Sequence, residues 1–134
     1  MSSRLLEDLT KPMQQMATIH KQLCKQQRVE LLIYCTLRGN DEQNELYAMG
    51  RTAKGQIVTN ARAGYSAHNP DANGKARAYD CVPMLGGKPM WDDKHPAWRI
   101  VVACGEEAGL VASARWSGKL REQEHFQDPE WRKP

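Results

Sequence analysis

The amino-acid sequence predicts an α+β fold in one small domain, with an antiparallel central sheet flanked by helices. Three observations carry this prediction. The patterns run helix, strand, helix, long loop, strands, helix and strands, without the regular alternation of a doubly wound sheet. The chain has 134 residues, and we expect a single domain over residues 1–134. Hydrophobic residues make up 40% and charged residues 26%, which is typical of a globular chain with a packed core.

The first helix is expected from Pro12 to about Gln27, after a short helical turn within residues 3–10. Proline suits the first turn of a helix because its missing N–H is not needed there. Apolar side chains recur along this segment at helical spacing, which favours a face packed on the core over a cofactor site. The stripe consists of Met13, Met16, Ile19 or His20, and Leu23.

The next segment predicts a strand followed by a helix. Residues 29–37, VELLIYCTL, have the β-branched and aliphatic character of a central strand. Asn40 or Asp41 is then suited to cap a second helix, for which Gly50 is the expected C-terminal stop.

The middle of the chain combines a long loop with a hairpin. Residues 51–78 lack periodicity and are rich in Gly, Asn, Ala and Ser, and a loop of this length in a small domain is usually functional or disordered. Residues 76–83 alternate like a strand. The stretch 82–91 predicts a hairpin that turns at Gly86-Gly87.

The last third predicts a helix and two strands. Asp93 is expected to cap a helix that begins near Pro96. Residues 111–116 and the short segment 125–127 have the character of strands, and the polar loop 118–124 joins them.

Charge and cysteine content narrow the class of protein. The net charge of +3 and the pI of about 8.7 lack the clustered basic residues of a nucleic-acid binder, so no nucleic-acid partner is expected. The cysteines are widely spaced without a CxxC pair, which favours buried reduced thiols over a zinc finger or a redox motif. They are Cys24, Cys35, Cys81 and Cys104.

The N-terminal segment MSSRLLEDLTKP lacks the central apolar region of a signal peptide, and none is expected. No run approaches the ~18 apolar residues of a membrane-spanning helix, so membrane insertion is not expected either.

The four histidines separate into two groups. A catalytic zinc ion needs about three protein ligands and an open position for water. His20 falls within the first helix, where packing or surface exposure is the simpler interpretation, and His95 suits a loop or capping position. His68 and His125 instead lie in glycine-rich or acid-rich segments with a carboxylate nearby, and they are the candidate ligands.

Two carboxylates accompany these histidines. Asp80 lies within an alternating strand, where burial is costly unless the charge is paired or metal-bound, but an exposed strand face explains it equally well. Glu122 precedes His125 by three residues and is suited to take a proton from metal-activated water, although a solvated charge run has the same appearance. Glu124 and Asp128 compete with Glu122 for this role.

Nine short motifs occur in order along nearly the whole chain. They are TLR (36–38), EQ (42–43), LYA (46–48), GRT (50–52), IVTNA (57–61), GYSAHN (64–69), ARAYD (76–80), GKPMW (87–91) and E-x-x-HF (122–126). Together they resemble the phage L-alanyl-D-glutamate endopeptidases, which are endolysins related to the D-alanyl-D-alanine carboxypeptidases and dipeptidases. The motifs are modest singly but specific as an ordered set.

The resemblance implies a zinc site. The family motif runs Ser-x-His, Gly-x-Ala-x-Asp and acid-x-x-His. Carried over, it makes His68, Asp80 and His125 the three zinc ligands and Glu122 the catalytic acid–base residue. The sequence departs from the family in having eleven residues, 69–79, between the first two ligands, and in using Glu where many phage enzymes have Asp.

The resemblance also implies residues for the substrate. Arg38 matches the family arginine that binds substrate and stabilises developing negative charge, and Ser66 matches a residue beside the substrate. The implied protein is a monomeric zinc peptidase with a hedgehog/D-Ala-D-Ala-peptidase-like fold that hydrolyses the L-Ala–D-Glu bond of peptidoglycan stem peptides. It would wait in the host bacterial cytoplasm and act on the cell wall after release.

Two alternatives stay open at this point. The glutamate base also fits a D-alanyl-D-alanine carboxypeptidase or dipeptidase. A zinc-binding or wall-binding module of the same fold without catalysis is the second, and Glu122 together with Arg38 argues against it.

Overall fold

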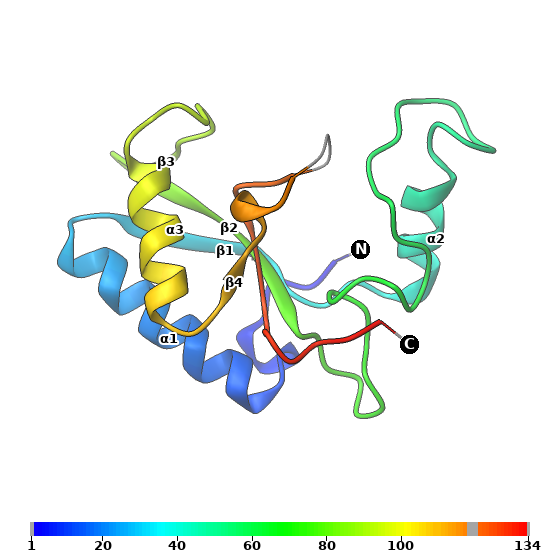
Figure 1. Ribbon diagram of the computed structural model, residues 1–134, viewed down its shortest axis with the longest axis horizontal. Coiled ribbons are helices and arrows are strands. Elements are labelled where there is room, and N and C mark those ends of the chain that lie inside the picture. Colours follow the sequence, from blue (N-terminus) through cyan, green and yellow to red (C-terminus); the bar gives the residue numbers. More distant parts are fainter. Residues whose placement is uncertain (1, 118–120, 134) are drawn as a thin grey trace.

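The computed structural model describes residues 2–117 and 121–133, and it has the predicted α+β architecture with an antiparallel sheet (Figure 1). The strands follow the order β1-β2-β5-β4, and the short β3 pairs with β2. The elements are η1 (Leu6–Asp8), α1 (Lys11–Gln26), β1 (Glu30–Cys35), α2 (Asn40–Ala48), β2 (Ala78–Leu85), β3 (Lys88–Pro89), α3 (Ala97–Glu107), β4 (Val111–Ala112), η2 (Ser113–Arg115) and β5 (His125–Gln127).

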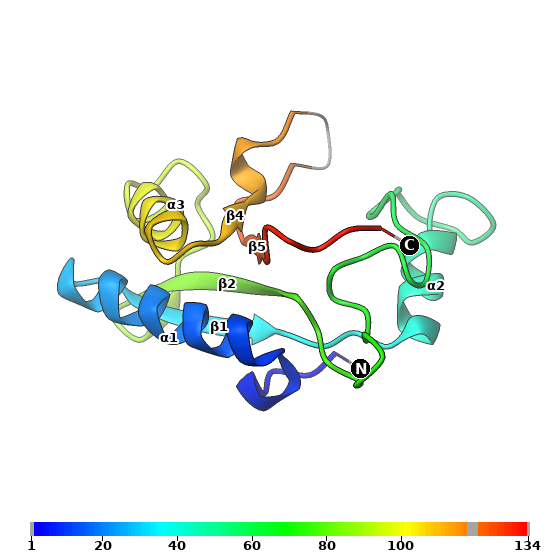
Figure 2. The same cartoon turned by 60° about the horizontal axis from the view of Figure 1, so that its bottom comes forward.

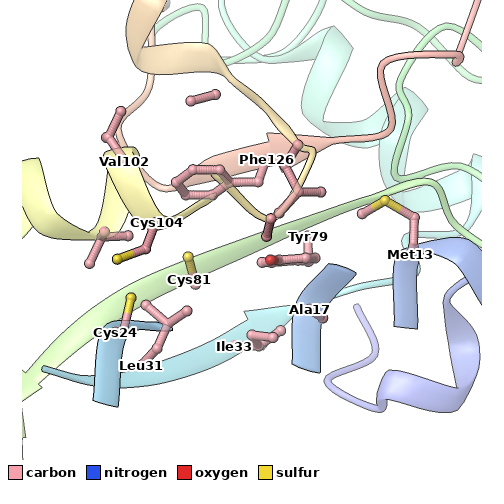
Figure 3. Packing of buried hydrophobic residues seen from close by; sticks show 14 of the residues in the cluster. Met13, Ala17, Cys24, Leu31, Ile33, Tyr79, Cys81, Val102, Cys104 and Phe126 are labelled. Atoms are coloured by element: carbon pink, nitrogen blue, oxygen red, sulfur yellow. The ribbon is translucent and has the colours of Figure 1, made fainter. Parts of the chain in front are cut away.

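The hydrophobic core lies where α1 and α3 pack against the sheet. Tyr79 and Cys81 of β2 and Phe126 of β5 join side chains from both helices in one buried cluster (Figure 3). Because successive side chains on a strand point to opposite faces, Asp80 and His125 are directed away from this cluster. In both ribbon views α2 and the long loop lie at the other end of the molecule from α1 and α3 (Figures 1 and 2).

Helix α1 confirms the predicted apolar stripe and decides between Ile19 and His20 as its third member. Thr10 Oγ1 accepts a hydrogen bond from Met13 N at 3.4 Å at the helix start. His20 is fully buried, whereas Ile19 is 44% exposed, so the histidine completes the core face. The buried residues of the helix are Met13, Ala17, His20 and Cys24.

His20 is held in the core as a neutral ring. Its Nε2 lies 2.8 Å from Val101 O, which can only accept, and its Nδ1 lies 2.7 Å from the Tyr79 hydroxyl, which donates to it. Burial lowers the pKa of His20 to about 4, and the hydrogen bond to Val101 offsets this only in part.

We expect the contribution of His20 to the stability of the metal-free protein to disappear as the pH falls from about 6.5 to about 4. The unfolded chain protonates His20 near pH 6.5 but the folded protein only near 4, so the unfolded state binds more protons in this window. The contribution is about 3 kcal/mol, complete above the window and lost through it. In urea unfolding, the stability difference between wild type and His20→Gln should therefore shrink on acidification, while His95→Gln should parallel wild type. A constant difference for His20→Gln would contradict this.

Strand β1 is an edge strand among the described strands, and the prediction of a central strand was wrong. Strand β2 is central instead, because it pairs with β1 on one side and with β5 and β3 on the other. Helix α1 packs against β1, which accounts for the apolar sequence of an edge strand. The register shifts between Ile33 and Cys35, so Cys35 becomes the partner of Asp80.

Both later helices begin without the expected side-chain caps. The N-cap of α2 is Gly39, so neither Asn40 nor Asp41 caps it. The N-cap of α3 is Pro96 rather than Asp93, and the ring Nδ1 of His95 accepts from Ala97 N at 3.1 Å. The ring nitrogen of His95 therefore takes the capping role that was expected of the Asp93 carboxylate.

The strand predicted over residues 111–116 is shorter than expected, whereas β5 (His125–Gln127) has the predicted bounds. Strand β4 ends at Ala112, and the rest of the expected strand 111–116 continues as η2. The Gly86-Gly87 hairpin is confirmed, with positive φ angles of 59° and 77° at the two glycines. Residues 118–120 of the expected polar loop lie outside the described residues.

All four cysteines are buried free thiols, as predicted. Within residues 2–117 and 121–133, no helix is both long enough and apolar enough to cross a membrane.

Candidate metal centre and cleft

Three side chains far apart in the sequence converge at one end of the sheet. His68 lies in the long loop, Asp80 on β2 and His125 at the start of β5. Asp80 and His125 are direct cross-strand partners, so the register of the β2–β5 ladder places them together. All three are buried, with exposed fractions of 3%, 7% and 8%. The interpretation of Asp80 as an exposed strand residue is therefore wrong.

The three donor atoms form a small triangle. His68 Nε2 lies 3.0 Å from Asp80 Oδ1, and His125 Nδ1 lies 3.2 Å from each of these atoms. Ligands about 2.05 Å from a tetrahedral zinc ion are roughly 3.3 Å from one another. The triangle therefore matches one face of a zinc coordination tetrahedron, and its two-imidazole, one-carboxylate donor set suits a catalytic zinc ion with an open fourth position.

The outer nitrogen of each ring has its own partner. His68 Nδ1 lies 2.8 Å from Thr36 O, and His125 Nε2 lies 2.8 Å from Gln127 Oε1. A carbonyl oxygen accepts only, so in these contacts the outer nitrogens carry the protons. When each ring is neutral, its inner nitrogen is therefore left with a lone pair that faces Asp80, which is the tautomer pair that a metal ion requires.

Without a metal, protons stabilise this cluster. Burial alone lowers the pKa of His68, but the Asp80 charge and hydrogen bond, with a smaller contribution from Cys35, reverse the shift and raise the pKa to about 10. Burial alone raises the pKa of Asp80, but His68 and His125 together hold it well below its usual range. A metal ion would compete with protons for the same lone pairs.

Two glutamates face the triangle from the segment before β5. A carboxylate oxygen of Glu122 lies within 4.8 Å of donor atoms of Asp80 and His125. Burial, with the negative charges of Glu124 and Asp80, raises the pKa of Glu122 to about 7. Burial also raises the pKa of Glu124, whose backbone oxygen accepts from Cys81 N at 3.0 Å and so attaches this segment to β2.

Arg38 lies on the loop side of the cleft, where a buried amide holds it. Its Nη1 donates to Gln43 Oε1 at 3.2 Å, and its Nε lies 3.5 Å from a Glu42 carboxylate oxygen. Its backbone N donates to His68 O at 2.8 Å, so the arginine and the histidine are joined through the main chain. Ser66 Oγ accepts from His68 N at 3.2 Å and shapes the turn before the histidine.

Two buried side-chain amides, Gln43 and Asn69, hold the side of the cleft that carries Arg38. Neither was a candidate site residue from the sequence. Gln43 Nε2 donates to Ala61 O at 2.6 Å, which ties α2 to the long loop. Asn69 Oδ1 accepts from Gly64 N and Ser66 N, and its Nδ2 donates to Arg38 O. Both residues lie within the short motifs of the sequence, but the carbonyl oxygens to which they donate, of Ala61 and Arg38, belong to residues 18 and 31 positions away, and nothing in the local pattern identifies these two.

A cleft of about 640 Å³ runs past the triangle. Aromatic side chains line it beside the charged ones, and Trp116 is 42% exposed with its ring centroid 5.7 Å from that of His125. All six residues singled out from the sequence line this one cleft: Arg38, Ser66, His68, Asp80, Glu122 and His125.

Cys35 lies beside the site, although the sequence pattern indicated only a place in the core for it. Its Sγ lies 3.8 Å from His68 Nδ1, and with His68 and Asp80 it forms a second group of atoms close enough to hold a metal ion. The nearer Thr36 carbonyl already occupies His68 Nδ1, whereas His125 completes a tighter triangle on the Nε2 side. The set with His125 is therefore the better metal site.

The long stretch between His68 and Asp80, the first two candidate ligands, forms a closed turn. Asp71 Oδ1 accepts from Asn73 N and Lys75 N at 2.8 Å and 2.9 Å, and Gly74 has a φ of 76°, which glycine adopts without strain. Because the turn closes on itself, the extra residues do not displace Asp80 from β2.

No family model matches the chain. It is 38% identical over 139 residues to the peptidoglycan L-alanyl-D-glutamate endopeptidase CwlK of Bacillus subtilis (strain 168), an alignment that covers 94% of this chain and 80% of CwlK. Its fold is similar to the crystal structure of the Serratia marcescens L-Ala D-Glu endopeptidase ChiX, with a TM-score of 0.61 and 18% identity over 95% of this chain and 87% of ChiX.

Proposed function

The chain belongs to the family of peptidoglycan L-alanyl-D-glutamate endopeptidases, and from this premise we propose that it is a zinc-dependent peptidase that hydrolyses the L-Ala–D-Glu bond of peptidoglycan stem peptides. The observation that carries the proposal is the triangle of His68 Nε2, Asp80 Oδ1 and His125 Nδ1, whose edges of 3.0–3.2 Å suit one zinc ion. The cleft beside it is large enough for a short peptide segment.

In this proposal the three residues of the triangle hold the metal, and the others act on the substrate. A bound zinc ion supplies a Lewis acid and lowers the pKa of its water. Glu122 accepts a proton from the attacking water and passes it to the leaving amine, a role that suits its pKa of about 7. Arg38 steadies the developing oxyanion or a nearby substrate carboxylate by charge-assisted hydrogen bonds. Ser66 orients the substrate.

The biological setting is proposed on the sequence resemblance. We propose that the protein acts as a monomeric phage or prophage endolysin, which remains in the host cytoplasm until release and then reaches the wall. This setting requires two results. Protein added from outside should lyse sensitised cells, and protein made inside the host should lyse it only when a membrane pore is also present.

We expect the purified protein to release peptides that begin with D-Glu from muropeptides, and to do so only with metal. Mass spectrometry of the digest and elemental analysis of the protein provide the test, with chelator-treated and zinc-restored protein as matched samples. Loss of terminal D-alanine alone would instead identify a carboxypeptidase or dipeptidase. Stoichiometric zinc without any product would identify a binding module.

A further inference from the structure

Gln127 is the side chain that contacts the outer nitrogen of His125. It lies two residues after the histidine on β5, so both side chains project from the same face of the strand. Its Oε1 lies 2.8 Å from His125 Nε2. The backbone of Gln127 pairs with Ala78 of β2 and Val111 of β4, and this two-sided pairing fixes the base of the side chain.

We propose that Gln127 is a positioning residue that sets the tautomer and the ring orientation of His125 for metal binding. This inference rests on the proposed function, in which His125 Nδ1 is a metal ligand. When Oε1 accepts the proton of Nε2, the lone pair of Nδ1 points at Asp80 and His68, both 3.2 Å away. Histidine ligands almost always donate their second N–H in this way, and losing such a partner typically costs 10–100-fold in metal affinity.

The orientation of the Gln127 amide determines whether the site is competent. If its NH₂ group faced the ring, it would donate to His125 Nε2 and drive the ring proton to Nδ1. That proton would then occupy the centre of the triangle, where it would exclude a metal ion. An accepting oxygen at this position is therefore what the metal site requires.

The two histidines differ in how they are held. His68 donates to the backbone carbonyl of Thr36, which no substitution removes. The hydrogen-bond partner of His125 is a side chain. Of the two histidines, only His125 therefore has a tautomer that can be tested by mutating its partner. Two variants of Gln127 separate the acceptor from the shape. Gln127→Met preserves length without an acceptor at the tip, and Gln127→Glu presents only acceptors.

We expect Gln127→Met to weaken zinc binding by about 10–100-fold at neutral pH and Gln127→Glu to retain at least wild-type affinity. Competition with a chromophoric chelator measures the affinities, and Glu130→Gln, which alters an exposed residue outside the cleft lining, should match wild type. Circular dichroism and urea unfolding of the metal-free variants confirm folding. At saturating zinc, Gln127→Met should recover most of its kcat with an unchanged KM.

Three outcomes would overturn the inference. The first is wild-type zinc affinity in Gln127→Met, and the second is an affinity of Gln127→Glu as weak as that of Gln127→Met. The third is a raised KM in Gln127→Met at saturating zinc, because it would show that the amide contacts substrate. If wild type itself bound no zinc, the proposed function would fail as well, and the two failures are thereby distinguished.

Discussion

Replacing Glu122 with glutamine is expected to lower kcat on muropeptides by about 10²–10⁴-fold while zinc stays bound, because a positioned general base contributes about this much. The glutamine keeps the shape of the side chain but cannot accept a proton. Glu122 is the carboxylate that approaches both Asp80 and His125, and its raised pKa suits transfer of a proton at neutral pH. The measurements are product release by mass spectrometry and zinc content of the same preparation.

Glu124 provides the matched control for this experiment. It is a second half-buried glutamate in the same cleft, and its pKa is also raised. We expect Glu124→Gln to retain kcat within a few-fold, since its side chain does not belong to the group formed with Asp80 and His125. If Glu124→Gln were inactive and Glu122→Gln active, the assignment of the base would be reversed.

Replacing Asp80 with asparagine is expected to remove both zinc and activity. The anionic oxygen that lies 3.0 Å from His68 Nε2 and 3.2 Å from His125 Nδ1 is lost, although the side-chain volume remains. Removing a ligand should cost more than the roughly 10–100-fold of an outer-shell partner, so stoichiometric zinc should disappear under dialysis. Elemental analysis and muropeptide digestion measure the two effects.

The exposed Asp93 supplies the control, and Asp93→Asn should behave as wild type. Full zinc occupancy with normal turnover in Asp80→Asn would show that another donor set holds the ion. The set that includes the Cys35 thiol is then the next to test, and Cys35→Ser would have to lose the metal.

The sequence predicts elements better than it predicts neighbours. The periodicity of α1 and the Gly86-Gly87 turn are local properties, and both appear where they were expected. The apolar strand 29–37 correctly indicated burial, but burial does not say how many strands lie beside it, and β1 proved to be at the edge. At the start of α3, His95 takes the capping position that the sequence allowed it, whereas Asp93 does not cap the helix.

The candidate site shows the same division. The spacing of His125 and Glu122 indicated their proximity, but the sequence alone left Asp80 undecided. The pairing of β2 with β5 decides it, because Asp80 faces His125 across the ladder. Partners such as Gln43 became visible only when segments far apart in the chain were brought together. The Gln127 contact was within reach of sequence reasoning, since a residue two positions after a ligand on a strand shares its face.

The in-register contact of Asp80 with His125 joins two residues that are synthesised at different times. Its two residues are 45 positions apart, and a growing chain that has not yet reached β5 contains only His68 and Asp80. A contact between residues this far apart in the chain costs loop-closure entropy, which slows its formation. If the proposed metal site is correct, a chain in which β5 has not paired with β2 lacks one of its three ligands, and metal binding depends on that pairing.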